Sequence, residues 1–273
     1  MKIDYLSISF YDRFSRFGVE MWTHGPASVL AGVVPAALMP TDVKDAKVVT
    51  QRPYPEGLLW SNGLSVLWGN SDTVLVRLSG RACAAIDCVV YLSSIQVKTE
   101  HLSLLNVSRL DVAHDIEDAR PPSVIVDGWG VNPRIKTRNV ATSGTGETVY
   151  IGSRTSDRFA RVYRYNEPHP RAGVPRVEFQ FGKRVANKIA NEIRGGKTDV
   201  RSVFIHAYNK TFKTPYATSA IHDATVTSHS ERSNAGTVVW FHKQVAPALS
   251  RLIREGEMTV ADVVAAITDY EAL

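Results

Sequence analysis

Three segments of the chain alternate apolar and polar side chains with a period of two, and this alternation constrains the fold most. They are RLDVAHD at 109–115, ARVYRY at 160–165 and RVEFQF at 176–181. Side chains two residues apart in a β-strand lie on the same face of the sheet. Each segment is therefore predicted to be a strand that has one apolar face and one face of reactive side chains.

The reactive faces of these strands hold carboxylates, arginines and tyrosines. If the three strands are neighbours in one sheet, these groups converge on one surface. Carboxylate oxygens of this kind suit Mg²⁺ or Mn²⁺. The side chains concerned are Asp111, Asp115, Arg161, Tyr163, Tyr165, Arg176 and Glu178.

Each of these residues also has an explanation that needs no ligand. Asp111 and Asp115 could lie on a solvated strand face or pair with Arg109. Glu178 could form an ion pair with a neighbouring arginine, and tyrosine is a common residue in strands. Two aspartates within a β-branched apolar strand are less ordinary, because strands disfavour Asp.

The rest of the chain predicts an α+β protein with a mainly antiparallel central sheet and flanking helices. Further strands are expected at 2–10, 65–69, 73–80, 134–140 and 147–153, and one buried helix at 81–95. Residues 72–115 then form a β-α-β unit, while 12–62 and 117–134 are rich in Pro or Gly and are expected to be loops, with short strands in the first. Helices are expected at 185–194, 199–212, 238–256 and 259–273, the first two separated by Gly195 and Gly196.

This order suggests a catalytic domain at 1–213 and a helical C-terminal segment at 214–273 that packs on it. The two cysteines, Cys83 and Cys88, cannot form a disulfide framework, which favours a reducing compartment. No apolar run is long enough for a signal peptide or a membrane span, so a cytoplasmic protein without membrane contact is expected.

Positive charge is concentrated in one part of the sequence. Residues 154–213 hold 14 Lys and Arg against 5 Asp and Glu, whereas residues 1–150 are nearly neutral. Such an excess suits a polyanion, although a solvated basic surface explains it equally well. We expect DNA contacts from Ser153, Arg158, Arg161, Arg164, Arg176, Lys183, Arg184 and Lys188.

The segment TVYIGSRTSDRFARVYRYNE at 148–167 is more specific than any single residue. A strand ends at Gly152, which permits an unusual turn, and Ser153, Arg154 and Ser156 then supply donors for a phosphate. A second strand returns with Tyr163 at its middle. Zinc-site, Walker-loop and Gly-x-Ser-x-Gly motifs are absent from the sequence, as is the His–apolar–His pattern of many DNA-nicking enzymes.

At these residues the sequence resembles the replication initiation factors of rolling-circle plasmids and filamentous phages, together with the related conjugative relaxases. The resemblance rests on SRLDVAHD, YIGSRTSDRFARVYRYNE and PRVEFQF, and more loosely on VRLSGRAC and VVWFHKQVAPAL. These blocks follow the order of the family over residues 64–250.

The resemblance implies DNA nicking and joining through a covalent 5′-phosphotyrosine that leaves a free 3′-OH. It implies that Tyr163 is the nucleophile and that Arg154 and Ser153 lie near the scissile phosphate. Tyr165 stands where other members often have a polar residue, so it is a second candidate nucleophile. The resemblance also implies a site for Mg²⁺ or Mn²⁺ at Asp111 and Glu178, with Asp115 as a third ligand.

The chemistry of these residues agrees with this implication. A tyrosine of ordinary pKa is only about one part in a thousand ionised at pH 7, a cost of roughly 4 kcal/mol. A divalent ion and nearby arginines can offset that cost. The expected partner is DNA at a replication origin, single-stranded or extruded as a cruciform at the nick; a host helicase and a second copy of the chain are further candidates.

Three other functions remain open at this point. A conjugative relaxase would use the same chemistry for DNA transfer, and a metal nuclease would use the carboxylates to activate water. A DNA-binding regulator would keep the fold without cutting. A covalent protein–DNA product separates the initiator and the relaxase from the other two.

Overall fold

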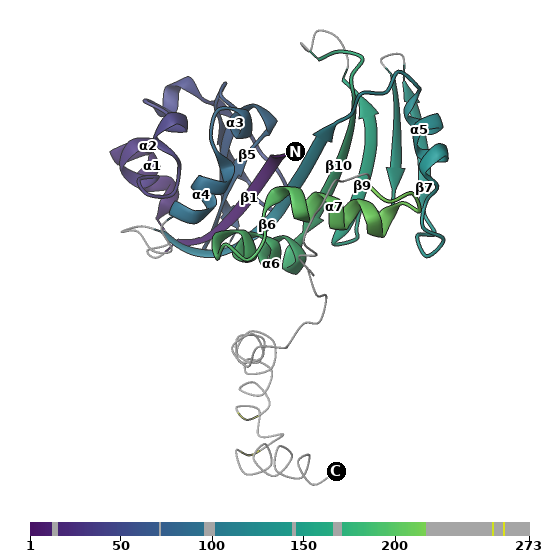
Figure 1. The fold of residues 1–273 in the computed structure, drawn as a ribbon. Coiled ribbons are helices and arrows are strands. Elements are labelled where there is room, and N and C mark those ends of the chain that lie inside the picture. Colours follow the sequence, from purple (N-terminus) through teal and green to yellow (C-terminus); the bar gives the residue numbers. More distant parts are fainter. Residues whose placement is uncertain are drawn as a thin grey trace. The chain divides into compact units, whose positions relative to one another are not determined.

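A ten-stranded sheet forms the centre of this computed structural model, with strand order β2-β3-β4-β5-β1-β6-β10-β9-β8-β7 (Figure 1). The described residues are 1–12, 16–70, 72–95, 102–143, 146–165, 171–216, 253 and 259. The strands are β1 (Lys2–Asp12), β2 (Lys47–Val48), β3 (Glu56–Leu59), β4 (Leu64–Asn70), β5 (Thr73–Leu78), β6 (Leu102–Asp115), β7 (Arg138–Ser143), β8 (Gly146–Ile151), β9 (Arg158–Arg164) and β10 (Pro175–Gly182). The neighbouring strands pair antiparallel, which confirms the predicted α+β class.

The first strand of the chain lies in the middle of the sheet. β1 pairs antiparallel with both β5 and β6, so β5 and β6 run in the same direction on either side of it. The β-α-β unit predicted at 72–115 is therefore present, with β1 inserted between its two strands. The apolar side chains Leu6, Ile8 and Phe10 of β1 are fully buried and anchor this centre.

Helices α6 (Lys183–Arg194) and α7 (Val200–Thr211) cover one face of the sheet (Figure 1). Ile189 and Ile193 of α6 are buried, and Phe204 of α7 packs on Phe179 of β10 with ring centroids 5.1 Å apart. The break between the helices comes at Gly196, whose φ of +65° favours glycine. The two helices predicted at 185–194 and 199–212 are thus confirmed.

Two further helices occupy stretches that were expected to be loops. α1 (Phe17–His24) lies within 12–62, and α5 (Pro122–Trp129) lies within 117–134. Pro122 is the first residue of α5. A backbone N–H at this position has no hydrogen-bond partner within the helix, so proline costs the helix no hydrogen bond. Ile125 and Val126 then bury their side chains fully, so packing stabilises this short helix despite its proline. A short helix that follows α1 in the chain, α2 (Pro26–Val29), was also not predicted.

The single helix expected at 81–95 is two helices, α3 (Gly80–Ala84) and α4 (Cys88–Ser94). The side chain of Asp87 accepts hydrogen bonds from the backbone N–H groups of Val89 and Val90, so it begins a new helix there. The strand expected at 134–140 begins later than predicted, as β7 at Arg138.

The chain divides into two units, Met1–Val226 and Thr227–Leu273. The helices expected at 238–256 and 259–273 lie outside the described residues, apart from Ile253 and Thr259, as does the polar link beyond residue 216. None of the helices in the described part of the chain is both long and apolar enough to span a membrane.

Candidate active site

The three strands with reactive faces are neighbours, in the order β6-β10-β9. Glu178 of β10 lies opposite Ala113 of β6 on one side and Arg161 of β9 on the other. Directly opposed residues of an antiparallel pair point to the same face. We call this face, which is opposite to α6 and α7, the polar face; it carries Tyr5, Asp111, Asp115, Arg161, Tyr163, Arg176 and Glu178.

Glu178 is the centre of the site. Its side chain is 1% exposed, and Nη2 of Arg161 lies 2.5 Å from its Oε1. The hydroxyl of Tyr163 donates a hydrogen bond to its Oε2 at 3.0 Å. Burial raises the pKa of Tyr163, and the negative charge of Glu178 raises it further. The tyrosine therefore keeps its proton in the resting site and has a carboxylate in contact with it.

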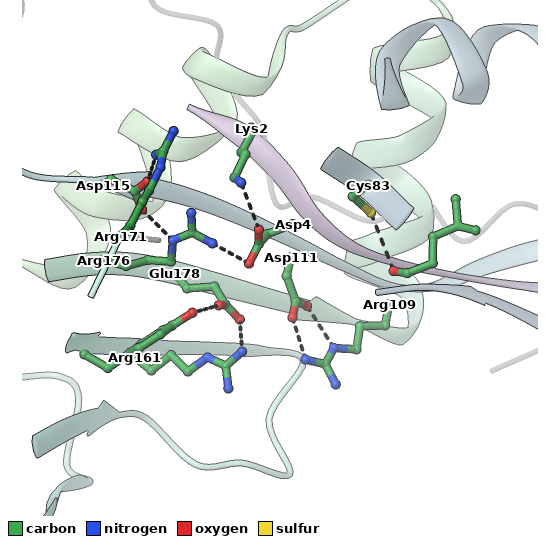
Figure 2. Close-up of polar contacts among 12 residues, drawn as sticks. Lys2, Asp4, Cys83, Arg109, Asp111, Asp115, Arg161, Arg171, Arg176 and Glu178 are labelled. Atoms are coloured by element: carbon green, nitrogen blue, oxygen red, sulfur yellow. Dashed lines mark hydrogen bonds and ion pairs between the residues drawn. The ribbon is translucent and has the colours of Figure 1, made fainter. Parts of the chain in front are cut away.

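Asp111 is the second buried carboxylate, with 0% exposure. Arg109 binds both of its oxygens, with Nε 2.8 Å from Oδ1 and Nη2 2.5 Å from Oδ2. Burial nevertheless raises the pKa of Asp111 to about 7, and the neighbouring Glu178 contributes to the increase. Figure 2 shows the carboxylates of Asp111 and Glu178 on one side of the sheet, each in contact with its arginine.

Asp115, predicted as a third metal ligand, is engaged elsewhere. It forms ion pairs with Nε of Arg176, at 2.6 Å, and with Arg171. Burial acts to raise the pKa of Asp115, but the hydrogen bonds and charge of the two arginines outweigh it and lower that pKa. The structure therefore separates the role of Asp115 from that of Asp111 and Glu178 (Figure 2).

Arg176, predicted to contact DNA, is instead 2% exposed. Its Nη1 lies 2.7 Å from Oδ2 of Asp4, and its guanidinium lies 4.5 Å from the ring centroid of Tyr165. The alternation correctly placed Arg176 on the polar face but could not show that neighbouring side chains cover it. Arg176 thus crosslinks β10, β6 and β1.

Asp111 and Glu178 are the candidate ligands for a divalent ion. Within the described residues, no group of three or more His, Cys, Asp or Glu side chains could hold a metal ion. Asp111 and Glu178 remain as a pair of adjacent buried oxygen donors. Burial is the main cause of the raised pKa of Asp111, and each carboxylate of the pair already has an arginine partner, Arg109 or Arg161. In donor chemistry, Asp111 and Glu178 are ligands of the kind that Mg²⁺ or Mn²⁺ prefers, but all four of their oxygens contact Arg109, Arg161 or Tyr163, so a bound ion would have to displace some of these contacts.

The two candidate nucleophiles lie side by side, with ring centroids 6.0 Å apart. Burial raises the pKa of Tyr165 to about 12, and the positive charge of Arg176 acts in the opposite direction. Tyr165 lies just beyond the end of β9, whereas Tyr163 is within the strand. The hydroxyl of Tyr163 donates a hydrogen bond to Glu178, which places a proton acceptor in contact with this phenol.

The turn between β8 and β9 borders the site. Gly152 has a φ of +90°, a conformation that other residues rarely adopt. Ser153 and Arg154 follow as exposed residues, and the guanidinium of Arg154 stacks 4.2 Å from the ring centroid of Tyr150. Arg158 is also exposed where β9 begins. Ser153 and Arg154 are thus accessible at the end of the β8–β9 hairpin, whereas Arg158 lies opposite Phe181, on the face of the sheet that α6 and α7 cover.

The other basic residues expected at the DNA lie away from Tyr163. Arg164 donates hydrogen bonds to the backbone carbonyls of Ala119 and Arg120. Lys183, Arg184 and Lys188 are on α6, which packs on the opposite face of the sheet. Lys183 pairs with Asp157 at 3.3 Å, and Lys188 pairs with Glu192 at 3.8 Å.

Sequence reasoning missed the contribution of β1 to the site. Asp4 pairs with Arg176, and Tyr5 lies opposite Asp111. The alternation of residues 2–10 was visible, but the sequence held no signal that this strand would lie next to β6.

The sheet has helices on one face and a tyrosine–carboxylate cluster on the other, in an α+β architecture. Among solved structures, the chain is similar to the rolling circle replication initiator protein from Geobacillus stearothermophilus, with a TM-score of 0.53 and 15% sequence identity. The match covers 82% of this chain and 89% of that one. No family model matches the sequence, and no curated protein matches it. At this identity the likeness shows a shared fold.

Proposed function

We propose that this protein is a rolling-circle replication initiator that nicks and rejoins DNA through Tyr163. The observation that carries the proposal is the hydrogen bond from the Tyr163 hydroxyl to Glu178 on the polar face. The shared fold with a rolling circle replication initiator supports it. So do the sequence blocks around Asp111, Tyr163 and Glu178 that resemble that family.

In the nicking step, the phenolic oxygen of Tyr163 attacks the scissile phosphorus and the bond from phosphorus to the 3′-oxygen breaks. The phenolic proton passes to Oε2 of Glu178, which already accepts it in a hydrogen bond. The 3′-oxygen leaves and takes a proton from water, which gives a free 3′-OH and a 5′-phosphotyrosine. Rejoining reverses these steps, so the bond energy is retained and no nucleotide cofactor is needed.

Arginines and carboxylates assist at defined positions. Arg161, whose guanidinium lies 5.2 Å from the ring centroid of Tyr163, can stabilise charge that develops on the phosphate. Arg154 is exposed beside the site and can bind a neighbouring phosphate. Asp111 and Glu178 would hold Mg²⁺ or Mn²⁺, which when bound supplies positive charge at the scissile phosphate.

The test uses the full-length protein and supercoiled DNA that carries a candidate origin. Proteins covalently attached to DNA are detected on a denaturing gel. We expect an adduct with the parent protein and none with Tyr163→Phe. Nicking without an adduct would instead support a metal nuclease, and binding without nicking would support a regulator.

A further inference from the structure

A second group of polar side chains lies on the polar face, on the side of Asp111 that is away from Tyr163. Ser7 of β1 lies between Arg77 of β5 and Arg109 of β6 and is paired with both. Ser65 of β4 lies opposite Arg77. We call this group the Arg77 cluster; it comprises Tyr5, Ser7, Ser65, Arg77, Ser108 and Arg109. No step of the nicking reaction uses Arg77 or the serines.

The contacts within the cluster leave Arg77 with neutral partners. Its Nε donates to Oγ of Ser65 at 3.2 Å, and its Nη1 donates to Oε1 of Gln51. None of the ion pairs found among the described residues includes Arg77. A half-buried guanidinium without a carboxylate is poorly compensated, so an anion beside it would be stabilised.

The same cluster offers a surface on which a flat ring can stack. The guanidinium of Arg109 lies 4.3 Å from the ring centroid of Tyr5. Three further arginine–tyrosine stacks lie across the sheet, namely Arg161 on Tyr163, Arg154 on Tyr150 and Arg176 on Tyr165. Alternating cations and aromatic rings are typical of surfaces that bind single-stranded nucleic acid, because phosphates meet the cations and bases stack on the rings.

The cluster is also continuous with the candidate active site. Tyr5 lies directly opposite Asp111, and Arg109 binds both oxygens of Asp111. Arg77 on β5 and Tyr163 on β9 are four strand spacings apart across the sheet, about 19 Å, and six residues apart along the strands, about 20 Å, so they are separated by about 28 Å in all. An extended strand with its scissile phosphate at Tyr163 would therefore reach the cluster within a few nucleotides.

We propose that the Arg77 cluster binds the single-stranded DNA that continues past the scissile phosphate. Arg77 contacts a backbone phosphate, and Tyr5 with Arg109 stacks on an unpaired base. The proposal rests on the proposed function for the position of the scissile phosphate. It assigns the substrate as single-stranded across this face, because bases paired in a duplex cannot stack on a sheet.

The experiment measures binding of a single-stranded origin oligonucleotide by Tyr163→Phe protein across a salt series. In this background we compare Arg77→Gln, which keeps a side chain able to hydrogen-bond with Ser65 but removes the charge. We expect the slope of log K against log salt to fall by about 0.7, the value for one phosphate contact on a single strand. Arg77→Lys should restore the slope, and Arg138→Gln, an exposed arginine of the edge strand β7, should not change it.

Trimming the oligonucleotide locates the contact. Nucleotides are removed one at a time from either end, and the effect of Arg77→Gln is measured at each length. We expect the effect to disappear after trimming from one end and to persist after trimming from the other. Tyr5→Ala should weaken binding severalfold for every base sequence. Equal slopes for Arg77→Gln and Arg138→Gln at all lengths, with thermal unfolding unchanged, would overturn the proposal.

A separate adduct assay with the parent protein distinguishes this proposal from the proposed function. An altered slope without any adduct would support the binding site and contradict the nicking reaction. An adduct with unaltered slopes would support the nicking reaction and contradict the binding site.

Discussion

Tyr163 and Glu178 are joined by a hydrogen bond of 3.0 Å across the β9–β10 pairing. Arg161, which lies directly opposite Glu178, holds the other carboxylate oxygen at 2.5 Å. The carboxylate is thus fixed between a cation and a phenol, and both of its oxygens have a defined direction. The arrangement needs Arg161 and Tyr163 on β9 and Glu178 on β10. It places a proton acceptor in contact with the hydroxyl of Tyr163 before any substrate binds.

Replacing the phenol tests its role directly. Tyr163→Phe removes the oxygen that attacks but keeps the ring, so we expect complete loss of the covalent adduct with DNA binding nearly unchanged. Tyr165→Phe is the matched control and should retain the adduct. Adduct assays on denaturing gels, together with binding of an uncleaved oligonucleotide, measure both effects. Retained adduct in Tyr163→Phe and loss in Tyr165→Phe would reverse the assignment.

Removing the carboxylate of Asp111 or Glu178 tests whether these residues bind a divalent ion. We expect Asp111→Asn or Glu178→Gln to abolish Mn²⁺ binding by titration calorimetry and metal-dependent nicking, because each supplies an oxygen donor at the paired site. Asp115→Asn should still bind Mn²⁺, since Asp115 is held by Arg171 and Arg176. Full nicking activity in EDTA would contradict a role for the ion.

The buried carboxyl of Asp111 should make stability depend on pH. Its pKa is about 7 in the folded protein, against 3.8 for an ordinary aspartate. Between these values the folded state binds more protons than the unfolded chain, so the free energy of unfolding falls as pH rises. We expect a loss on the order of a few kcal/mol from pH 4 to 7 without added metal. Urea unfolding should show a shallower dependence for Asp111→Asn; equal dependence in the two proteins would contradict the raised pKa.

The buried Arg176 should be essential to the fold. Arg176→Met leaves the half-buried Asp4 and Asp115 without their shared buried cation, with Lys2 and Arg171 as remaining ion-pair partners, and the loss of a buried ion-pair partner typically costs about 3–5 kcal/mol. Arg171→Met removes an exposed partner of Asp115 and should cost under about 1 kcal/mol. Denaturant unfolding of both variants gives the comparison. A stable Arg176→Met protein with weakened DNA binding would restore the role predicted from the sequence.

The basic side of α6 should matter only for longer DNA. Lys188 lies on the face of the sheet opposite to Tyr163, so an oligonucleotide confined to the polar face does not reach it. We expect Lys188→Ala to lower the salt slope by about one unit for origin DNA with duplex arms, and to leave a short single strand unaffected. Binding measured across a salt series with both substrates gives the result. No change with either substrate would mean that this helix face is merely solvated.

Period-two alternation was sufficient to predict the faces of β6, β9 and β10. It placed Asp111, Tyr163 and Glu178 on one surface because side chains two residues apart in a strand lie on the same face of the sheet. It could not order the strands, so the insertion of β1 and the contacts of Asp4 and Tyr5 were not predictable. Knowing which face a side chain occupies also does not show how deeply it is buried. Arg176 is buried because Asp4 of β1, Asp115 of β6 and Tyr165 beyond the end of β9 lie against it.

Short helices were missed for a different physical reason. α1 buries only Phe17 and Met21, a single pair one turn apart, which gives too little periodicity to recognise. In α5 the prolines suggested a loop, although Pro122 occupies the first helical position. The prediction of one helix at 81–95 was wrong because the chain starts a new helix at Asp87. The side chain of Asp87 accepts hydrogen bonds from backbone N–H groups, which competes with continuation of the first helix.

Consecutive residues of β10 belong to the core and to the reaction centre in turn. Phe179 packs against Phe204, while Glu178, one residue earlier, holds Tyr163 and Arg161. A substitution that lets α7 shift would tilt this strand and lengthen the contact between phenol and carboxylate. Evolutionary change at Phe179 or Phe204 is therefore tied to turnover as well as to folding, and variants at these core positions should be found in screens for lost replication.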